Sequence, residues 1–83
     1  MSQIPEPYKS AHKHSSHHRK ELQASEVCGC FYCTKSFPPH AIRDWIGADT
    51  ARCPHCGIDA VLGSASGYEL TPDFLEQMKH HWF

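Results

Sequence analysis

Two Cys-x-x-Cys pairs are the residues of this chain best suited to chemistry, and nineteen residues separate them. Each pair can close a tight loop, here called a knuckle, that presents two sulfurs to one ion. Two knuckles at such a spacing are typical of a tetrahedral zinc site with four thiolate ligands. We therefore predict one structural Zn²⁺ ion bound by Cys30, Cys33, Cys53 and Cys56.

Cys28 is the fifth cysteine of the chain and lies two residues before the first knuckle. The two-residue gap between Cys30 and Cys33 is the favoured ligand spacing, which leaves Cys28 as a spare thiol. Three interpretations stay open: a buried apolar filler, which we favour, an alternate ligand, or a redox-sensitive thiol beside the metal.

The size of the chain explains why a metal would be needed. With 83 residues and 40% hydrophobic content, the protein can bury only a small core. A structural zinc ion contributes roughly 10–16 kcal/mol of apparent binding free energy in small finger peptides. We therefore expect the domain to be poorly folded without metal.

The composition favours a reducing compartment. An odd number of cysteines argues against a secreted disulfide framework, and residues 1–27 contain no apolar core of a signal peptide. Nor does any run approach the eighteen apolar residues of a membrane span. We expect a cytoplasmic protein that does not contact a membrane.

The first fifteen residues are expected to form a flexible arm, because Pro5 and Pro7 interrupt a stretch without periodicity. A single zinc-stabilised domain would then occupy residues 16–83, with helix from residue 16 to residue 24. Basic side chains without acidic neighbours gather in residues 9–20, namely Lys9, Lys13, Arg19 and Lys20. His14 and His18 would share a helix face and could bind a second metal, although we favour a solvated polar arm.

Between the knuckles, residues 36–47 are predicted to form a short helix. Proline fits its first turn, Ile42, Trp45 and Ile46 recur at helical spacing, and Gly47 suits its C-terminal cap. Trp45 is expected to be the largest core side chain. Residues 48–52 and 58–63 are predicted as short strands, and residues 68–70 as a possible third.

The strongest helix signal is at the C-terminal end. Thr71 is the expected N-cap, Pro72 the first helical residue, and an apolar stripe follows, made of Phe74, Leu75, Met78 and Trp82. The predicted fold is thus a small α+β, zinc-ribbon-like domain with two knuckles, a short middle helix and a C-terminal helix.

Catalytic signals are weak. Four thiolates leave no open position on the metal for a substrate. A His-Asn-His nuclease is disfavoured because the chain contains no asparagine. A metal or redox sensor that uses the histidines and Cys28 is a further, less favoured hypothesis. We predict that the protein is not an enzyme.

Several runs resemble a family of small bacterial proteins that are generally described only as cytoplasmic proteins. The residues that carry the resemblance are Cys28–Cys33, Phe37–Pro39 with Ile42 and Trp45, Cys53-Pro54 with Cys56–Asp59, and Gly63–Tyr68 with Leu75, Met78 and Trp82-Phe83. The resemblance covers roughly residues 17–83 and implies a bacterial, cytoplasmic setting. It implies no reaction and no partner.

These observations predict a small, non-catalytic zinc-binding adapter. Its partner would be RNA or DNA, or a protein of the transcription or translation machinery, contacted through the basic arm and an exposed knuckle aromatic, Phe31 or Tyr32. The alternative is a protein–protein interaction module that docks through the C-terminal helix and Trp82-Phe83. The oligomeric state stays open.

Overall fold

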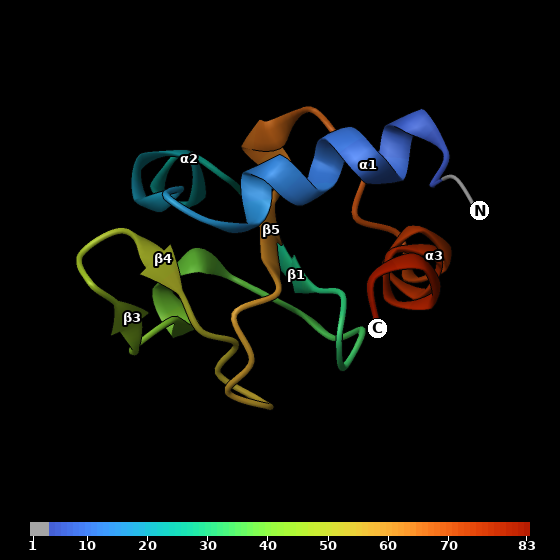
Figure 1. Ribbon diagram of the computed structural model, residues 1–83. Coiled ribbons are helices and arrows are strands. Elements are labelled where there is room, and N and C mark those ends of the chain that lie inside the picture. The colour runs from blue at the N-terminus through green and yellow to red at the C-terminus, as the bar shows by residue number, and fades with distance from the viewer. Residues whose placement is uncertain (1–3) are drawn as a thin grey trace.

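A three-stranded antiparallel sheet lies at the centre of the computed structural model, which describes residues 4–83 (Figure 1). Its strand order is β2-β1-β5, and β3 and β4 form a separate two-stranded sheet. The helices are α1 (Glu6–His12), α2 (Arg19–Gln23) and α3 (Pro72–Trp82), and the strands are β1 (Cys28–Cys30), β2 (Ser36–Phe37), β3 (Trp45–Ile46), β4 (Thr50–Ala51) and β5 (Val61–Gly63). Single 3-10 turns occupy Lys13–Ser15, Pro39–Ala41 and Ser64–Ser66. The predicted small α+β class is therefore observed.

The central pair of strands is fully buried. Every residue of β1 and β5 is buried, and the pairing sets Cys28 opposite Gly63 and Cys30 opposite Val61. Figure 1 shows α1 passing across one end of this pair, with α2 and α3 on either side. Such short strands cannot form a stable sheet alone, so the packing around them must contribute most of the stability.

Helix α3 forms as predicted and packs closely on β1. The Phe74 N–H donates to Thr71 Oγ1 over 3.1 Å, which is the expected N-cap. Leu75 and Met78 are completely buried. A Cβ atom at Gly29 would lie 3.0 Å from Leu75 Cδ1, so glycine allows the helix to approach the strand. None of the helices within residues 4–83 is long and apolar enough to span a membrane.

The N-terminal segment is ordered, and here the expected flexible arm over residues 1–15 needs correction. Residues 6–15 form α1 and a 3-10 turn, and Ala11 is completely buried. Trp82 Nε1 donates to the Tyr8 carbonyl oxygen over 3.1 Å, and the His12 and Trp82 rings stack with centroids 3.9 Å apart. Proline at the N-cap and first turn begins a helix rather than preventing one. Residues 1–3 of the expected arm lie outside the described residues.

The middle helix predicted over residues 36–47 is wrong. This segment contains β2, one 3-10 turn and β3, because β2 pairs with β1 and β3 pairs with β4. Trp45 is only half-buried, with the Arg19 guanidinium 4.6 Å above its ring, and Phe31 is the largest fully buried side chain instead. The strands expected in residues 48–52 and 58–63 are confirmed as β4 and β5, whereas residues 68–70 form no strand.

His18 connects the N-terminal segment to β4, because its two ring nitrogens bond one backbone group in each. Its Nδ1–H donates to the His14 carbonyl oxygen over 2.6 Å, and its Nε2 accepts from the Ala51 N–H over 3.0 Å. This arrangement requires the neutral imidazole, because a proton on Nε2 would point at the Ala51 N–H, which is itself a donor. Burial accordingly lowers the pKa of His18.

The lowered pKa predicts a specific loss of stability in acid. Below about pH 6.5 the unfolded chain binds a proton at this position that the folded protein resists. The contribution of His18 is therefore complete above about pH 6.5 and is lost as the pH falls towards the lower, folded-state pKa, at no more than about 1.4 kcal/mol per pH unit. Urea unfolding of the zinc-saturated protein at about pH 7.5 and about pH 5.5 should show a larger loss for the wild type than for His18→Gln. Equal losses would contradict the buried neutral imidazole.

Candidate metal centre

The first knuckle is held by hydrogen bonds to its leading cysteine. Cys30 ends β1, and its N–H donates to the Lys35 carbonyl oxygen over 3.0 Å. The Thr34 N–H donates to the Cys30 carbonyl oxygen over 2.8 Å, which closes the turn. The Tyr32 N–H points at Cys30 Sγ over 3.3 Å. The backbone therefore positions the sulfur and stabilises its negative charge.

The second knuckle repeats this arrangement. The Cys53 N–H donates to the Ile58 carbonyl oxygen over 2.9 Å, and the Gly57 N–H donates to the Cys53 carbonyl oxygen over 2.9 Å. The His55 N–H lies 3.3 Å from Cys53 Sγ. The two knuckles are thus two copies of one local structure, which the paired Cys-x-x-Cys motifs predicted.

A left-handed residue follows each knuckle. Gly57 has a φ of 79°, and Thr34 occupies the equivalent position with a φ of 63°. Glycine adopts this conformation without steric cost, so Gly57 is not strained. Thr34 gave no signal of this conformation, because β-branched residues strongly disfavour positive φ. Its strained backbone is a property of the site that the sequence did not reveal.

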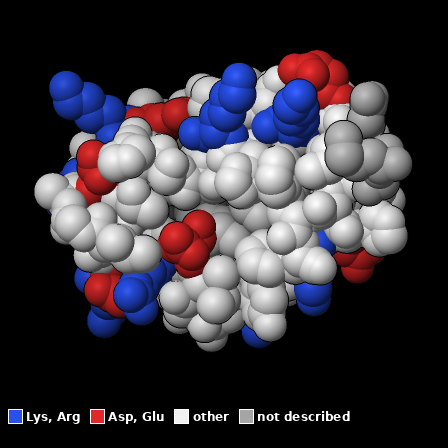
Figure 2. Space-filling view, viewed as in Figure 1, with Lys and Arg blue, Asp and Glu red and all other residues white. Residues whose placement is uncertain are grey.

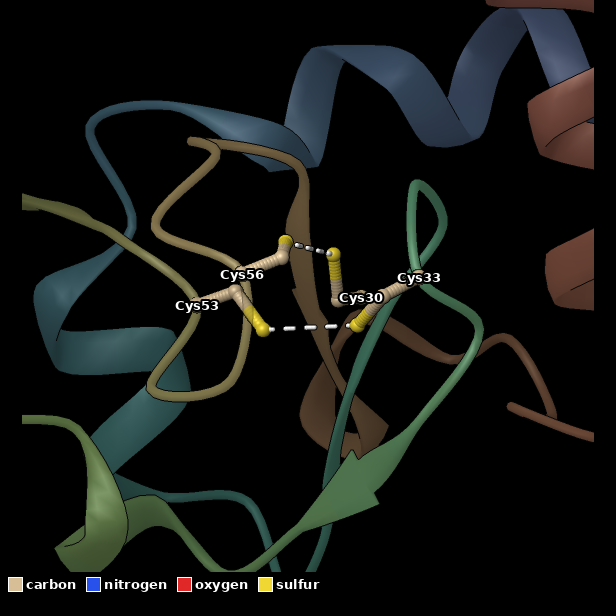
Figure 3. A group of neighbouring side chains, drawn as sticks. All are labelled: Cys30, Cys33, Cys53 and Cys56. Atoms are coloured by element: carbon tan, nitrogen blue, oxygen red, sulfur yellow. Dashed lines mark hydrogen bonds between the residues drawn. The ribbon is translucent and has the colours of Figure 1, made fainter.

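The four knuckle sulfurs form one cluster (Figure 3). All lie within 4.8 Å of one another, and the two shortest separations, Cys30 to Cys56 and Cys33 to Cys53, are each 3.6 Å. Zn–S bonds of about 2.3 Å in a tetrahedron place sulfurs roughly 3.8 Å apart. A disulfide needs about 2.05 Å, and all five cysteines are free. The donor set and its spacing therefore fit a metal ion such as Zn²⁺.

The electrostatics of the cluster also favour a cation. Burial raises the pKa of Cys30 and of Cys53. Burial also acts to raise the pKa of Cys33, but hydrogen bonds from the Lys35 N–H and from the neighbouring thiols outweigh it and lower the pKa overall. Four thiolates this close repel one another strongly unless a metal ion neutralises them. Metal binding must therefore displace the thiol protons.

Cys28 stands apart from the cluster. It is completely buried in β1, between Phe37 of β2 and Gly63 of β5, and is not one of the grouped ligands. Burial raises the pKa of its thiol to about 11, so the reactive thiolate is scarce near neutral pH. This supports the buried-filler interpretation over the alternate ligand and the redox-sensitive thiol.

The structure of residues 4–83 does not bring His14 and His18 together as a pair of metal ligands. His14 Nδ1 lies 2.8 Å from Glu21 Oε1, while both nitrogens of His18 are used by backbone groups. His14 lies in the 3-10 turn and His18 is the N-cap of α2, so the two residues do not share one helix face. Within the described part of the chain, the four knuckle cysteines are the one cluster of three or more metal-ligating side chains.

The two aromatics of the first knuckle differ in exposure, and one of them is exposed as expected. Phe31 is buried with 2% of its surface exposed, whereas Tyr32 is 39% exposed. The sequence did not show what surrounds them. Phe83 lies against both rings, with centroids 5.8 Å from Phe31 and 4.9 Å from Tyr32, and Lys79 Nζ lies 5.3 Å from the Tyr32 ring centroid.

Comparison with known proteins found no relatives of this chain. A scan against protein-family models, a search of curated proteins and a search of solved structures each found no match to this chain. The inference about function therefore depends on the geometry of the residues themselves, and the resemblance to small bacterial cytoplasmic proteins stays a prediction.

The two left-handed positions give a matched pair of substitutions. Thr34→Gly should stabilise the zinc-loaded protein by about 0.5–1 kcal/mol, because relief of the strained backbone exceeds the added freedom of the unfolded chain. Gly57→Ala should destabilise it by about 1 kcal/mol, although a Cβ there meets nothing within 4 Å. Urea unfolding of both variants at saturating zinc provides the measurement. A loss of stability in Thr34→Gly would show that Thr34 is not strained.

Proposed function

We propose that this protein is a small, non-catalytic zinc-binding adapter that binds single-stranded nucleic acid in the course of transcription or translation. The observation that carries the proposal is the closed set of four sulfurs, all within 4.8 Å of one another. A structural site of this kind fixes a surface instead of activating a substrate. The protein's function then depends on what that surface contacts.

The ligand set argues against catalysis at the metal. A catalytic zinc ion generally has three protein ligands and an open position for water, often with histidine or carboxylate donors. Here four thiolates complete the tetrahedron. The nearby His55 extends its backbone N–H toward Cys53 Sγ, and its ring packs edge-on against Phe37 at 5.8 Å. Its backbone and ring therefore support the second knuckle.

The distribution of charge favours a single strand over a duplex. On the face shown in Figure 2, both basic and acidic side chains lie along the edge that α1 forms, and most of the remaining surface is neutral. The formal net charge is −1. Duplex binders generally present a strong basic patch, whereas single-strand binders add stacking on aromatic side chains to a modest electrostatic attraction.

The alternative, docking of a protein through α3, receives less support. The apolar stripe of α3 is already used within the chain: Leu75 and Met78 are buried in the core, and Trp82 packs on α1. Phe83, at this helix end, is a large apolar side chain that stays mostly exposed. A helix whose apolar face is occupied offers a partner little to bind.

Binding to oligonucleotides at varied salt tests the proposal. The zinc-loaded protein should bind a short fluorescein-labelled oligouridylate more tightly than a DNA duplex of equal length. Affinity should fall linearly on a log–log plot between about 20 and 200 mM salt. Joint replacement of Lys9, Lys13 and Lys20 by glutamine should reduce the slope, by about 0.7 for each lost phosphate contact.

Arg43→Gln is the matched control, because it removes one exposed positive charge outside the N-terminal segment. Arg19 is left unchanged, since it stacks on Trp45 and donates to the Ala48 carbonyl oxygen over 2.8 Å. The absence of any oligonucleotide binding at the lowest salt would contradict the proposed function.

A further inference from the structure

Two exposed aromatic rings form a corner beside the first knuckle. The ring centroids of Tyr32 and Phe83 are 4.9 Å apart and their planes meet at 73°. Tyr32 is 39% exposed and Phe83 60% exposed, which makes Phe83 the most exposed large hydrophobic side chain in the described residues. A flat ring of a ligand could therefore stack on the face of one of these side chains and contact the edge of the other.

Contacts with the rest of the fold hold both rings in place. The Tyr32 N–H contacts the sulfur of the ligand Cys30, so the metal centre fixes the backbone that carries this ring. Phe83 donates its N–H to the Lys79 carbonyl oxygen over 2.9 Å, and its ring rests 5.8 Å from that of the buried Phe31. The corner is therefore held by the zinc site on one side and by the end of α3 on the other.

Next to the corner lies a hollow of about 430 Å³, within the size range of ligand-binding pockets. Thr34, Glu76, Lys79, His80 and Phe83 line it. Lys79 Nζ lies 5.3 Å from the centre of the Tyr32 ring, and the exposed Lys35 follows Thr34 directly in the chain. Within this lining Glu76 offsets Lys79, so the Lys79 ammonium group over the Tyr32 ring, rather than a net positive charge, is what an anionic ligand would contact.

We propose that the corner binds one base of a single-stranded nucleic acid, with Tyr32 and Phe83 as the stacking surfaces and Lys79 as the phosphate contact. This inference rests on the proposed function and names its binding site. Stacking on aromatic rings tolerates any base, because every base has a π-face. The Lys79 ammonium group near the rings is placed to contact the negatively charged phosphate backbone of a nucleic acid. An uncharged apolar peptide would not require such a contact.

Substitutions at the corner test the site in the full-length, zinc-loaded protein with the same labelled oligouridylate. Tyr32→Ala should weaken binding about tenfold and leave the salt slope unchanged, while Tyr32→Phe should bind like the wild type. Phe83→Leu keeps an apolar side chain over Phe31 but removes the flat ring, and it should also weaken binding about tenfold. Lys79→Gln should weaken binding and reduce the salt slope by about 0.7.

Ile46→Ala is the matched control, since Ile46 is 41% exposed on β3 and belongs to the other sheet. Zinc content and the far-ultraviolet circular dichroism of every variant confirm that the fold is intact. If the wild type binds oligouridylate and both Tyr32→Ala and Phe83→Leu bind as tightly as Ile46→Ala, the site is wrong while the proposed function stands.

Failure of the wild type to bind any oligonucleotide would overturn the proposed function together with its site. Sedimentation of the wild type and of Phe83→Leu over a range of concentrations covers the other occupant of the corner, a second copy of the chain. Self-association that Phe83→Leu abolishes, without oligonucleotide binding, would assign the corner to a protein interface and overturn the inference.

Discussion

The grouping of four cysteine sulfurs within 4.8 Å of one another is the constraint on which the rest of this structure depends. Cys30 ends β1 of the three-stranded sheet, and Cys53 follows β4 of the two-stranded sheet after one residue. No strand is longer than three residues among those the structure describes, so backbone pairing alone would not hold either sheet. A metal ion bound by both knuckles would tie the two sheets together, and the same sulfurs without it would be protonated or mutually repelled.

The helices pack around these sheets, first α3 on β1 and then α1 on α3. Leu75 of α3 packs over Gly29 of β1, and α1 then packs on α3 through aromatic contacts. His18 connects the end of the N-terminal segment to β4 by its neutral imidazole. The proposed binding corner lies where these two regions meet, because Tyr32 belongs to a knuckle and Phe83 to the end of α3. A surface made in this way depends on the metal although no exposed residue in it binds the metal.

The parts of the fold that sequence predicted are those with local signals. The ligand cysteines and the N-cap of α3 are specified within a few residues by spacing and turn chemistry. The failures have two causes. A long-range contact fixes α1, because Trp82 Nε1 reaches Tyr8 74 residues away, and at Trp45 the local strand pairing with Ala51 replaces the helix that the apolar periodicity predicted. Thr34 and the Tyr32–Phe83 corner were invisible, because backbone closure and tertiary proximity leave no pattern in the chain.

Zinc titration of the metal-free, reduced protein, followed by near-ultraviolet circular dichroism, tests the central claim most directly. The aromatic signals of Trp82, Tyr8 and Phe31 arise from contacts that need the complete fold. We predict weak signals without metal, a linear rise to saturation at about one equivalent of Zn²⁺, and no such rise in a Cys30→Ser/Cys53→Ser variant. A full native spectrum in the metal-free protein, or in that variant, would show that the knuckles do not determine the fold.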